Sequence, residues 1–327
     1  MTFYRKLILA ALLLAFCVIV LGAYVRLSDA GLGCPDWPGC YGKLTPHHAS
    51  AEIDAALKDN PHGVVSHAKA WKEMVHRYLA GTLGLLVMAI LGLTLWQRAE
   101  VRGGIGLPAA LAALIVFQAL LGMWTVTERL KPVVVSAHLL GGMATLALLT
   151  WLWLREARPA QPVYYARAEH LRGPAAIGLA LVAVQIALGG WVSSNYAALA
   201  CPDFPTCQGQ WWPATDFAQA FSVRRELGYT ASGELLPIAA LTAIHWTHRL
   251  MALVVAVFLG VLAARLAGVA GFRGSASILG GLLALQILLG IGNVVFGLPL
   301  ALAVLHNAGA ALLLVAMVML NFRLRRN

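Results

Sequence analysis

Residues 7–25 read LILAALLLAFCVIVLGAYV, a run without a charged residue or a proline, and this stretch decides the fold class. A helix of about 20 apolar residues spans the hydrocarbon core of a bilayer, because each residue adds about 1.5 Å. Arg5 and Lys6 precede the run, as in a signal peptide. The run is longer than the usual signal core, however, and no small-residue cleavage site follows it. We therefore expect a membrane helix that is retained.

Seven further apolar runs have a similar length. They are residues 74–96, 105–126, 133–154, 174–194, 236–264, 275–296 and 300–321. Of the 327 residues, 60% are hydrophobic and only 12% are charged, against roughly 25% charged in ordinary globular proteins. A soluble domain of this size has too much surface to bury so many apolar side chains. The sequence predicts an all-α polytopic membrane protein with eight transmembrane helices.

The basic residues indicate the orientation of these helices. With the N-terminus inside, 13 of the 24 Lys and Arg residues fall on the inner face, in short loops or tails where the positive-inside rule applies. They are Arg5, Lys6, Arg98, Arg102, Arg155, Arg158, Arg167, Arg172, Arg265, Arg273, Arg323, Arg325 and Arg326. The formal charge of +10 therefore reflects topology and gives no support to nucleic-acid binding. No transit peptide is visible, so we expect a bacterial plasma (inner) membrane with both termini in the cytoplasm.

Two outer segments, about 27–70 and 195–235, are longer than simple connectors. Ser50 and Asp216 are residue types that cap helices, so each segment is expected to contain a short helix. Two interpretations of these segments stay open: lids over sites at the outer surface, or solvated spacers.

The two halves of the chain repeat each other. Cys34-Pro-Asp-Trp-Pro-Gly-Cys40 recurs 167 residues later as Cys201-Pro-Asp-Phe-Pro-Thr-Cys207. Gln118-x-Leu-Leu-Gly and His138 recur at an offset of 168, as Gln286-x-Leu-Leu-Gly and His306. His76-Arg77 recurs as His248-Arg249 at an offset of 172. Because each half holds an even number of spans, the sequence predicts two parallel repeats, 1–170 and 171–327, each a four-helix bundle.

Four histidines lie at one predicted depth. His76, His138, His248 and His306 each stand 6 to 10 residues inside the outer end of an even-numbered span, which is about 9–15 Å into the membrane. Two neutral imidazoles on facing helices suit axial ligation of a haem iron, so we expect one haem site in each half. Zinc is disfavoured, because no carboxylate or thiol lies at matching depth in all four helices. The alternative is a structural imidazole bonded to a serine or a carbonyl.

Glu73 stands three residues before His76, where the second half has His245 before His248. A carboxylic acid beside a haem edge can give or take a proton, whereas the alternative is an ion pair with Lys72 or Arg77. The asymmetry predicts chemistry in the first half and a held cofactor in the second. Arg77 and Arg249 are expected either to neutralise haem propionates or to extend toward the membrane surface.

Four of the five cysteines form two Cys-x5-Cys loops on the outer face. An oxidising exterior favours a disulfide in each loop, Cys34–Cys40 and Cys201–Cys207. These bonds are either structural or linked to redox chemistry. Cys17 lies within the first span and is expected to be a small core residue.

Several of these segments together resemble the haem A synthase family. They are the string from Arg26 to Cys40 (RLSDAGLGCPDWPGC), Glu73-Met-Val-His76-Arg77, His138, His245-Trp-Thr-His248-Arg249 and Leu-His306-Asn307. The likeness covers essentially the whole chain, including the eight spans and the twofold repeat.

The resemblance implies an oxidoreductase that converts the C8 methyl of haem O into a formyl group by successive hydroxylations, giving haem A. It implies a haem b cofactor between His248 and His306 and the substrate haem between His76 and His138. Glu73 would be the essential acid near the reacting methyl, and the Cys34–Cys40 pair would be linked to activity. Some members lack the second pair, Cys201 and Cys207. Expected partners are the haem O synthase (protohaem farnesyltransferase), an electron acceptor or thiol-redox protein outside, and the lipid membrane.

Three other functions use part of the same pattern. A dihaem cytochrome b-type electron carrier would use the same four histidines, but it would leave Glu73 without a role. A transporter or haem exporter is disfavoured by the parallel repeat and by the sparse intramembrane charge. A membrane thiol oxidoreductase would leave four buried histidines unexplained.

Overall fold

The computed structural model describes residues 2–61, 63–97, 103–157 and 166–325. Within these ranges eight helices are long and apolar enough to cross a membrane, and there is no β-strand. The long helices are α1 (Phe3–Leu27), α3 (His67–Trp96), α4 (Gly106–Thr127), α5 (Pro132–Glu156), α6 (Arg172–Ser194), α8 (Ile238–Ala267), α9 (Arg273–Val295) and α10 (Leu300–Arg325). The short ones are α2 (Ser50–Asp59), α7 (Phe217–Ala220) and the 3₁₀ helices η1 (Ala166–Leu171) and η2 (Ala197–Leu199).

All eight predicted spans are confirmed as helices, and the largest difference lies at the start of α3. This helix begins at His67, well before the apolar run at residue 74. Ser66 caps it, since its hydroxyl accepts a hydrogen bond from the backbone N–H of Lys69 at 3.3 Å. Burial of Ala70 and Glu73 holds the extra turns in place.

The short helices predicted in the two long segments are also present, as α2 and α7. Asp216 caps α7 as expected, because its carboxylate accepts the backbone N–H of Gln219 at 3.1 Å. Ser50 is the first residue of α2 rather than its cap, and Ala49 takes the cap position without a side-chain bond.

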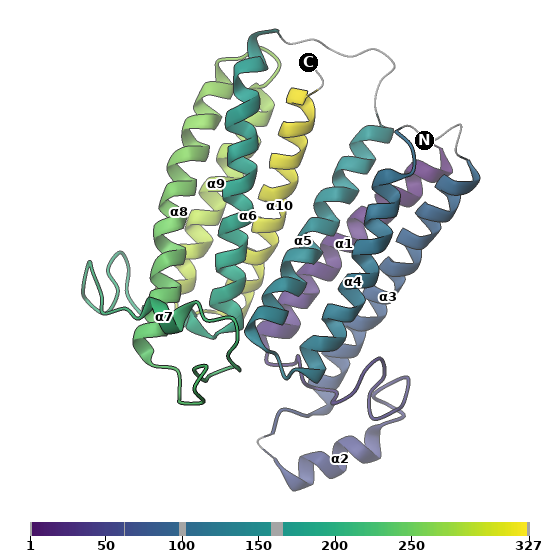
Figure 1. The fold of residues 1–327 in the computed structure, drawn as a ribbon, viewed down its shortest axis with the longest axis vertical. Coiled ribbons are helices and arrows are strands. Elements are labelled where there is room, and N and C mark those ends of the chain that lie inside the picture. The colour runs from purple at the N-terminus through teal and green to yellow at the C-terminus, as the bar shows by residue number, and fades with distance from the viewer. Residues whose placement is uncertain (1, 62, 98–102, 158–165, 326–327) are drawn as a thin grey trace.

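The long helices pack as two neighbouring groups of four (Figure 1). In one group α1 and α4 each pack against α3 and α5, and in the other α6 and α9 each pack against α8 and α10. Contacts of α10 with α1 and α5, and of α5 with α6, join the groups. At this junction the hydroxyls of Ser136 and Ser194 lie 3.0 Å apart, and Arg26 donates to the carbonyl of Ser193 at 2.9 Å. These contacts show which helices are neighbours. The parallel repeat of the two halves stays a prediction.

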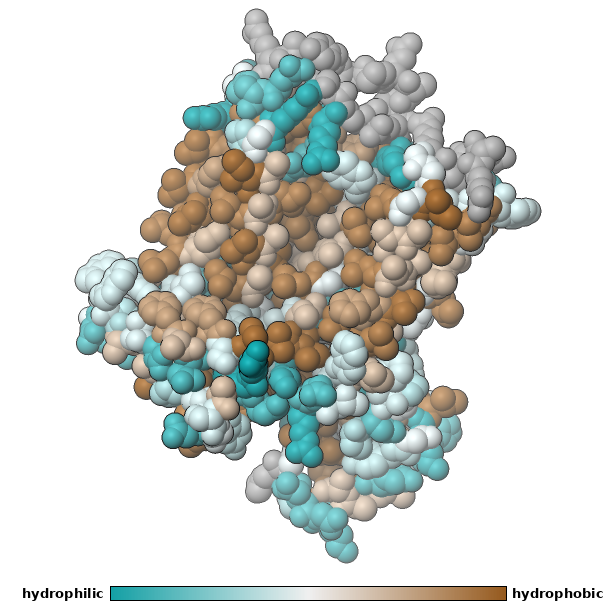
Figure 2. Space-filling view, in the orientation of Figure 1, coloured by the Kyte–Doolittle hydropathy of each residue, from teal (hydrophilic) through white to brown (hydrophobic). Residues whose placement is uncertain are grey.

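The bundle has two polar ends and an apolar middle (Figure 2). One end, here called the loop end, carries the segments 28–66 and 195–237, and both chain termini lie at the opposite end (Figure 1). Arg5, Arg155, Arg265 and Arg323 stand at the terminal end, as the charge pattern predicts. Arg98, Arg102, Arg158 and Arg326 lie outside the described residues. The chain is therefore a multi-pass membrane protein.

Candidate haem-binding and catalytic site

The four predicted histidines stand at one level below the loop end. Each lies six to ten residues after the first residue of its helix: His76 in α3, His138 in α5, His248 in α8 and His306 in α10. These four helices all begin at the loop end (Figure 1). Their imidazoles therefore occupy a common layer about 9–15 Å inside the helix ends.

The histidines come together as two pairs, one in each group of helices. His76 lies within electrostatic reach of His138, and His248 lies within reach of His306. All four side chains are partly buried. Within the described residues no three His, Cys, Asp or Glu side chains form a metal site. Two imidazoles in each group suit the axial positions of a haem iron and do not suit zinc, which usually takes at least three protein ligands.

Arg77 fastens the first cysteine loop to α3. Its Nη1 donates to the carbonyls of Asp36 at 2.8 Å and Gly39 at 2.5 Å, and its Nη2 donates to Glu73 Oε1 at 2.5 Å. The second oxygen of Glu73 accepts the backbone N–H of Cys34 at 2.9 Å. Glu73 is only 4% exposed. The ion-pair partner of Glu73 is thus Arg77, and the same pair joins the loop to the turn above His76.

Arg249 makes the matching contacts in the second group. Its Nη1 donates to the carbonyls of Asp203 and Thr206, each at 2.8 Å, and its Nη2 donates to the carbonyl of Cys201 at 2.8 Å. Its Nε donates to His245 Nε2 at 3.2 Å. We did not expect from the sequence that these arginines bind the cysteine loops. Two repeated features could have indicated it: in both halves an arginine directly follows the site histidine, and both halves contain a cysteine loop.

Both cysteine loops are closed by disulfides, Cys34–Cys40 and Cys201–Cys207, as predicted. An aspartate organises each turn: Asp36 accepts the N–H groups of Tyr41 and Gly42, each at 2.6 Å. In the second loop the Thr206 hydroxyl and the Gly209 N–H hold the pKa of Asp203 below its usual range. That carboxylate therefore stays ionised, and stabilises its loop, at neutral pH.

The predicted core position of Cys17 is wrong, because the side chain is exposed on α1. In a membrane protein the lipid-facing surface is as apolar as the core. A small apolar residue within a span can therefore lie on the core side or on the lipid-facing side of its helix, and helix packing determines which.

The arginine contacts give a testable prediction. Lysine keeps the charge of Arg249 but cannot reach three carbonyls at once. Arg249→Lys should lose at least one hydrogen bond worth about 1.5–3 kcal/mol, so the second loop should open more often, and dithiothreitol should reduce Cys201–Cys207 at least about 10- to 100-fold faster. Trapping of free thiols and mass spectrometry would measure both disulfides in one sample. The Cys34–Cys40 bond of the same molecule is the internal control. Equal rates for both disulfides in this variant would contradict the role assigned to Arg249.

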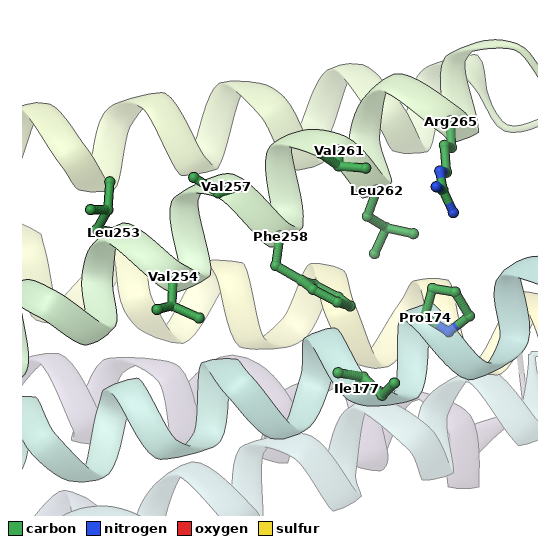
Figure 3. Close-up of a pocket in the computed structure, with 9 residues that line it drawn as sticks. All are labelled: Pro174, Ile177, Leu253, Val254, Val257, Phe258, Val261, Leu262 and Arg265. Carbon is green, nitrogen blue, oxygen red and sulfur yellow. The ribbon is translucent and has the colours of Figure 1, made fainter.

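An apolar groove of about 560 Å³ runs along the outer surface between α6 and α8 (Figure 3). Pro174 and Ile177 of α6 face Val254 and Phe258 of α8, and Arg265 stands at one end. The groove lies toward the terminal end of the bundle, away from the layer of histidines. Its lining offers no group for acid–base chemistry or metal ligation, so the histidine layer is the candidate site.

The chain is similar to known proteins over nearly its whole length. The family model described as cytochrome oxidase assembly protein matches residues 5–318. The chain is 45% identical to a haem A synthase of Shewanella oneidensis, over 95% of this chain and 93% of the relative. It is 30% identical to the haem A synthase of Caulobacter vibrioides, over 96% of this chain and 93% of the relative. The family model matches almost the whole chain, and the two relatives are 45% and 30% identical to it over nearly their full length. The chain therefore belongs to the haem A synthase family of cytochrome oxidase assembly proteins.

Proposed function

We propose that this protein oxidises the C8 methyl of haem O to a formyl group by successive hydroxylations, giving haem A. One observation carries the proposal: two histidine pairs share one layer, and only one of them has a buried carboxylate one turn above it. That arrangement fits one reacting ring and one resident ring. The names of the relatives agree with haem A as the product.

The resident group in this proposal is haem b, held by His248 and His306 in the second group of helices. Its fit rests on the two imidazole donors, and the buried His306 Nδ1 has no hydrogen-bond partner of good geometry within the protein. Haem b supplies reversible one-electron chemistry when it is bound. The protein side chains hold the ring and keep it within the same bundle as the substrate site.

The substrate haem is assigned to His76 and His138, which would hold its iron in the layer below the first cysteine loop. Glu73 is assigned the proton transfers at the reacting carbon. Support for this role comes from its burial and from its position three residues before His76, which is one turn away on the same helix face. Its bonds to Arg77 and to the Cys34 N–H fix the carboxylate relative to His76.

The proposal also places the protein in the bacterial plasma membrane with its termini in the cytoplasm and its loop end outside. Haem O carries a long isoprenoid chain, so substrate and product would move through the lipid phase. The haem O synthase would deliver the substrate, and an acceptor at the outer face would take electrons that leave through haem b.

The test is the haem content of cells that also make haem O synthase. Expression of this protein should convert most haem O into haem A, measured by chromatography of extracted haems against cells with an empty vector. The dihaem electron carrier predicts a different result: coloured protein with haem O unchanged. Purified protein that stays colourless when haem is supplied would exclude both functions.

A further inference from the structure

A short motif occurs once in each of the four helices that carry none of the site histidines. Each copy ends in Leu-Gly and has Val or Gln four residues before the glycine. The copies are Val18-Ile-Val-Leu-Gly22 in α1, Gln118-Ala-Leu-Leu-Gly122 in α4, Gln185-Ile-Ala-Leu-Gly189 in α6 and Gln286-Ile-Leu-Leu-Gly290 in α9. Nothing in the proposed chemistry yet uses these residues.

Each of these glycines lies directly against one site histidine. A methyl group built on Gly22 would stand 2.9 Å from Cε1 of His76, and one on Gly189 would stand 3.1 Å from Cε1 of His248. On Gly122 it would stand 3.3 Å from Cε1 of His138, and on Gly290 it would stand 3.3 Å from Cε1 of His306. Carbon atoms prefer about 3.5–4.0 Å, so a methyl group at any of these four positions would press on the facing imidazole and force it to shift.

Cε1 lies between the two ring nitrogens, so contact at this edge fixes where both nitrogens point. In an α-helix the side chain of residue i+4 leans back over the carbonyl of residue i. A glycine at i+4 therefore uncovers that carbonyl, whose second lone pair can accept a bond from a neighbouring helix. The motif spacing of four residues is the spacing that this geometry requires.

The rings lie near these uncovered groups. His76 lies near the carbonyl of Val18, four residues before Gly22. His138 and His306 lie near the carbonyls of Gln118 and Gln286 in the same way. The Nδ1 atoms of these three histidines are buried, and no hydrogen bond of good geometry reaches them. The carbonyl is thus the acceptor available once Nδ1 carries the proton.

At His248 the side chain of the motif residue takes part. Gln185 Nε2 lies 3.2 Å from His248 Nδ1 and also donates to the His248 carbonyl at 3.2 Å. Its Oε1 is buried without a partner, so a half-turn of the amide would present an acceptor to a protonated Nδ1. Gln286 Nε2 likewise donates to the carbonyl of His306 at 3.0 Å. In the second group of helices, the motif glutamines therefore tie the histidine backbone to the glycine-bearing helix.

We propose that Gly22, Gly122, Gly189 and Gly290 are positioning residues: each sets the ring of its histidine, and Gly22, Gly122 and Gly290 also uncover the carbonyl that would accept Nδ1–H, so that Nε2 is free to bind a haem iron. Histidine ligands commonly donate their second N–H to such an acceptor, and its loss typically costs 10- to 100-fold in affinity. This inference rests on the proposed function, because it concerns the ligands of the same two haem sites.

The test uses the purified full-length protein with the haem it retains from expression. Gly290→Ala should displace the His306 ring, change the electron paramagnetic resonance g values of the low-spin ferric haem, and lower the haem affinity about 10- to 100-fold. Gly281→Ala is the matched control, because Gly281 lies in the same helix with no atom within 4 Å of an added methyl. The control should keep the spectrum and haem content of the wild type.

A second pair of variants keeps the inference testable if Gly290→Ala fails to fold. Gly189→Ala acts on His248 from α6 and should alter the same haem, whereas Gly260→Ala in α8 meets open space and should not. Gly122→Ala, in the first group of helices, should leave the spectrum of haem b unchanged. A g-value shift confined to Gly189→Ala and Gly290→Ala would support the inference.

The possible results of this experiment test the inference and the proposed function separately. If the wild-type protein binds haem, identical spectra within each pair would overturn the inference alone. The pairs are Gly290→Ala with Gly281→Ala and Gly189→Ala with Gly260→Ala. Wild-type protein that never binds haem would overturn the proposed function itself. A loss of haem in both members of each pair would show a general effect of helix substitution, and it too would overturn the inference.

Discussion

Replacing His248 or His306 with alanine should leave the purified protein without its resident haem. Either change removes an axial ligand from the site proposed for haem b, and losing a ligand should cost at least the 10- to 100-fold that loss of an outer-shell partner typically costs. Haem A output should then fall about 10- to 100-fold, because the one-electron chemistry that haem b would supply is lost. Haem per polypeptide, measured by pyridine haemochrome, and extracted haem A from the same cells would check both effects.

The control for these variants is His170→Ala. His170 is exposed in η1, remote from the layer of site histidines, so its loss should change neither haem content nor product. Normal haem A formation by protein that lacks haem b would refute the electron path. Full retention of haem in both His248→Ala and His306→Ala would refute the ligand assignment.

Glu73→Gln should separate chemistry from haem binding. The variant keeps the size of the side chain and an oxygen for the Cys34 N–H, but it removes the carboxylate that is assigned the proton transfers. Positioned acid–base groups typically contribute 10²- to 10⁴-fold, so haem A formation should fall by about that factor. The low-spin spectrum of the haem held by His248 and His306 should remain, because that pair belongs to the other group of helices.

The structural role of Glu73 needs its own control, since the carboxylate also pairs with Arg77. Glu156 provides one: it is a buried carboxylate in the same group of helices, and it lies 3.4 Å from Arg155 at the opposite end. Glu156→Gln should also lose a buried ion pair, although a longer one, and keep haem A formation. Equal losses of haem A formation in both variants would show that Glu73 acts by stabilising the fold, and this result would contradict its acid–base role.

The membrane spans were predictable because their cause is local. A bilayer requires about 20 apolar residues in sequence, and the run at residues 7–25 meets this requirement without reference to any other part of the chain. Helix starts were less predictable. The seven residues before residue 74 are polar enough to resemble a loop, yet the Ser66 cap and burial of Ala70 make them part of α3.

Part of the candidate site was also predictable from the sequence. The repeated histidines and cysteines marked a twofold pattern, and helix rise alone placed the histidines at one depth. The ion pair of Glu73 with Arg77 was one of the expected alternatives, but the loop carbonyls that Arg77 and Arg249 bind were not predictable, because they lie about 40 residues or more away in the sequence. Only folding of the cysteine loops over the helix ends brings those groups together.

The sequence by itself determined the membrane class, the eight spans and the four histidines, since each depends on composition or on spacing within one helix. Tertiary structure alone decided which glycine lies against each ring, which loop carbonyls Arg77 and Arg249 bind, and that Cys17 faces outward. The reason is physical: in a membrane protein, apolar residues cover both the core and the lipid-facing surface. Hydrophobicity therefore positions a helix in the bilayer but does not determine which side of that helix meets its neighbours.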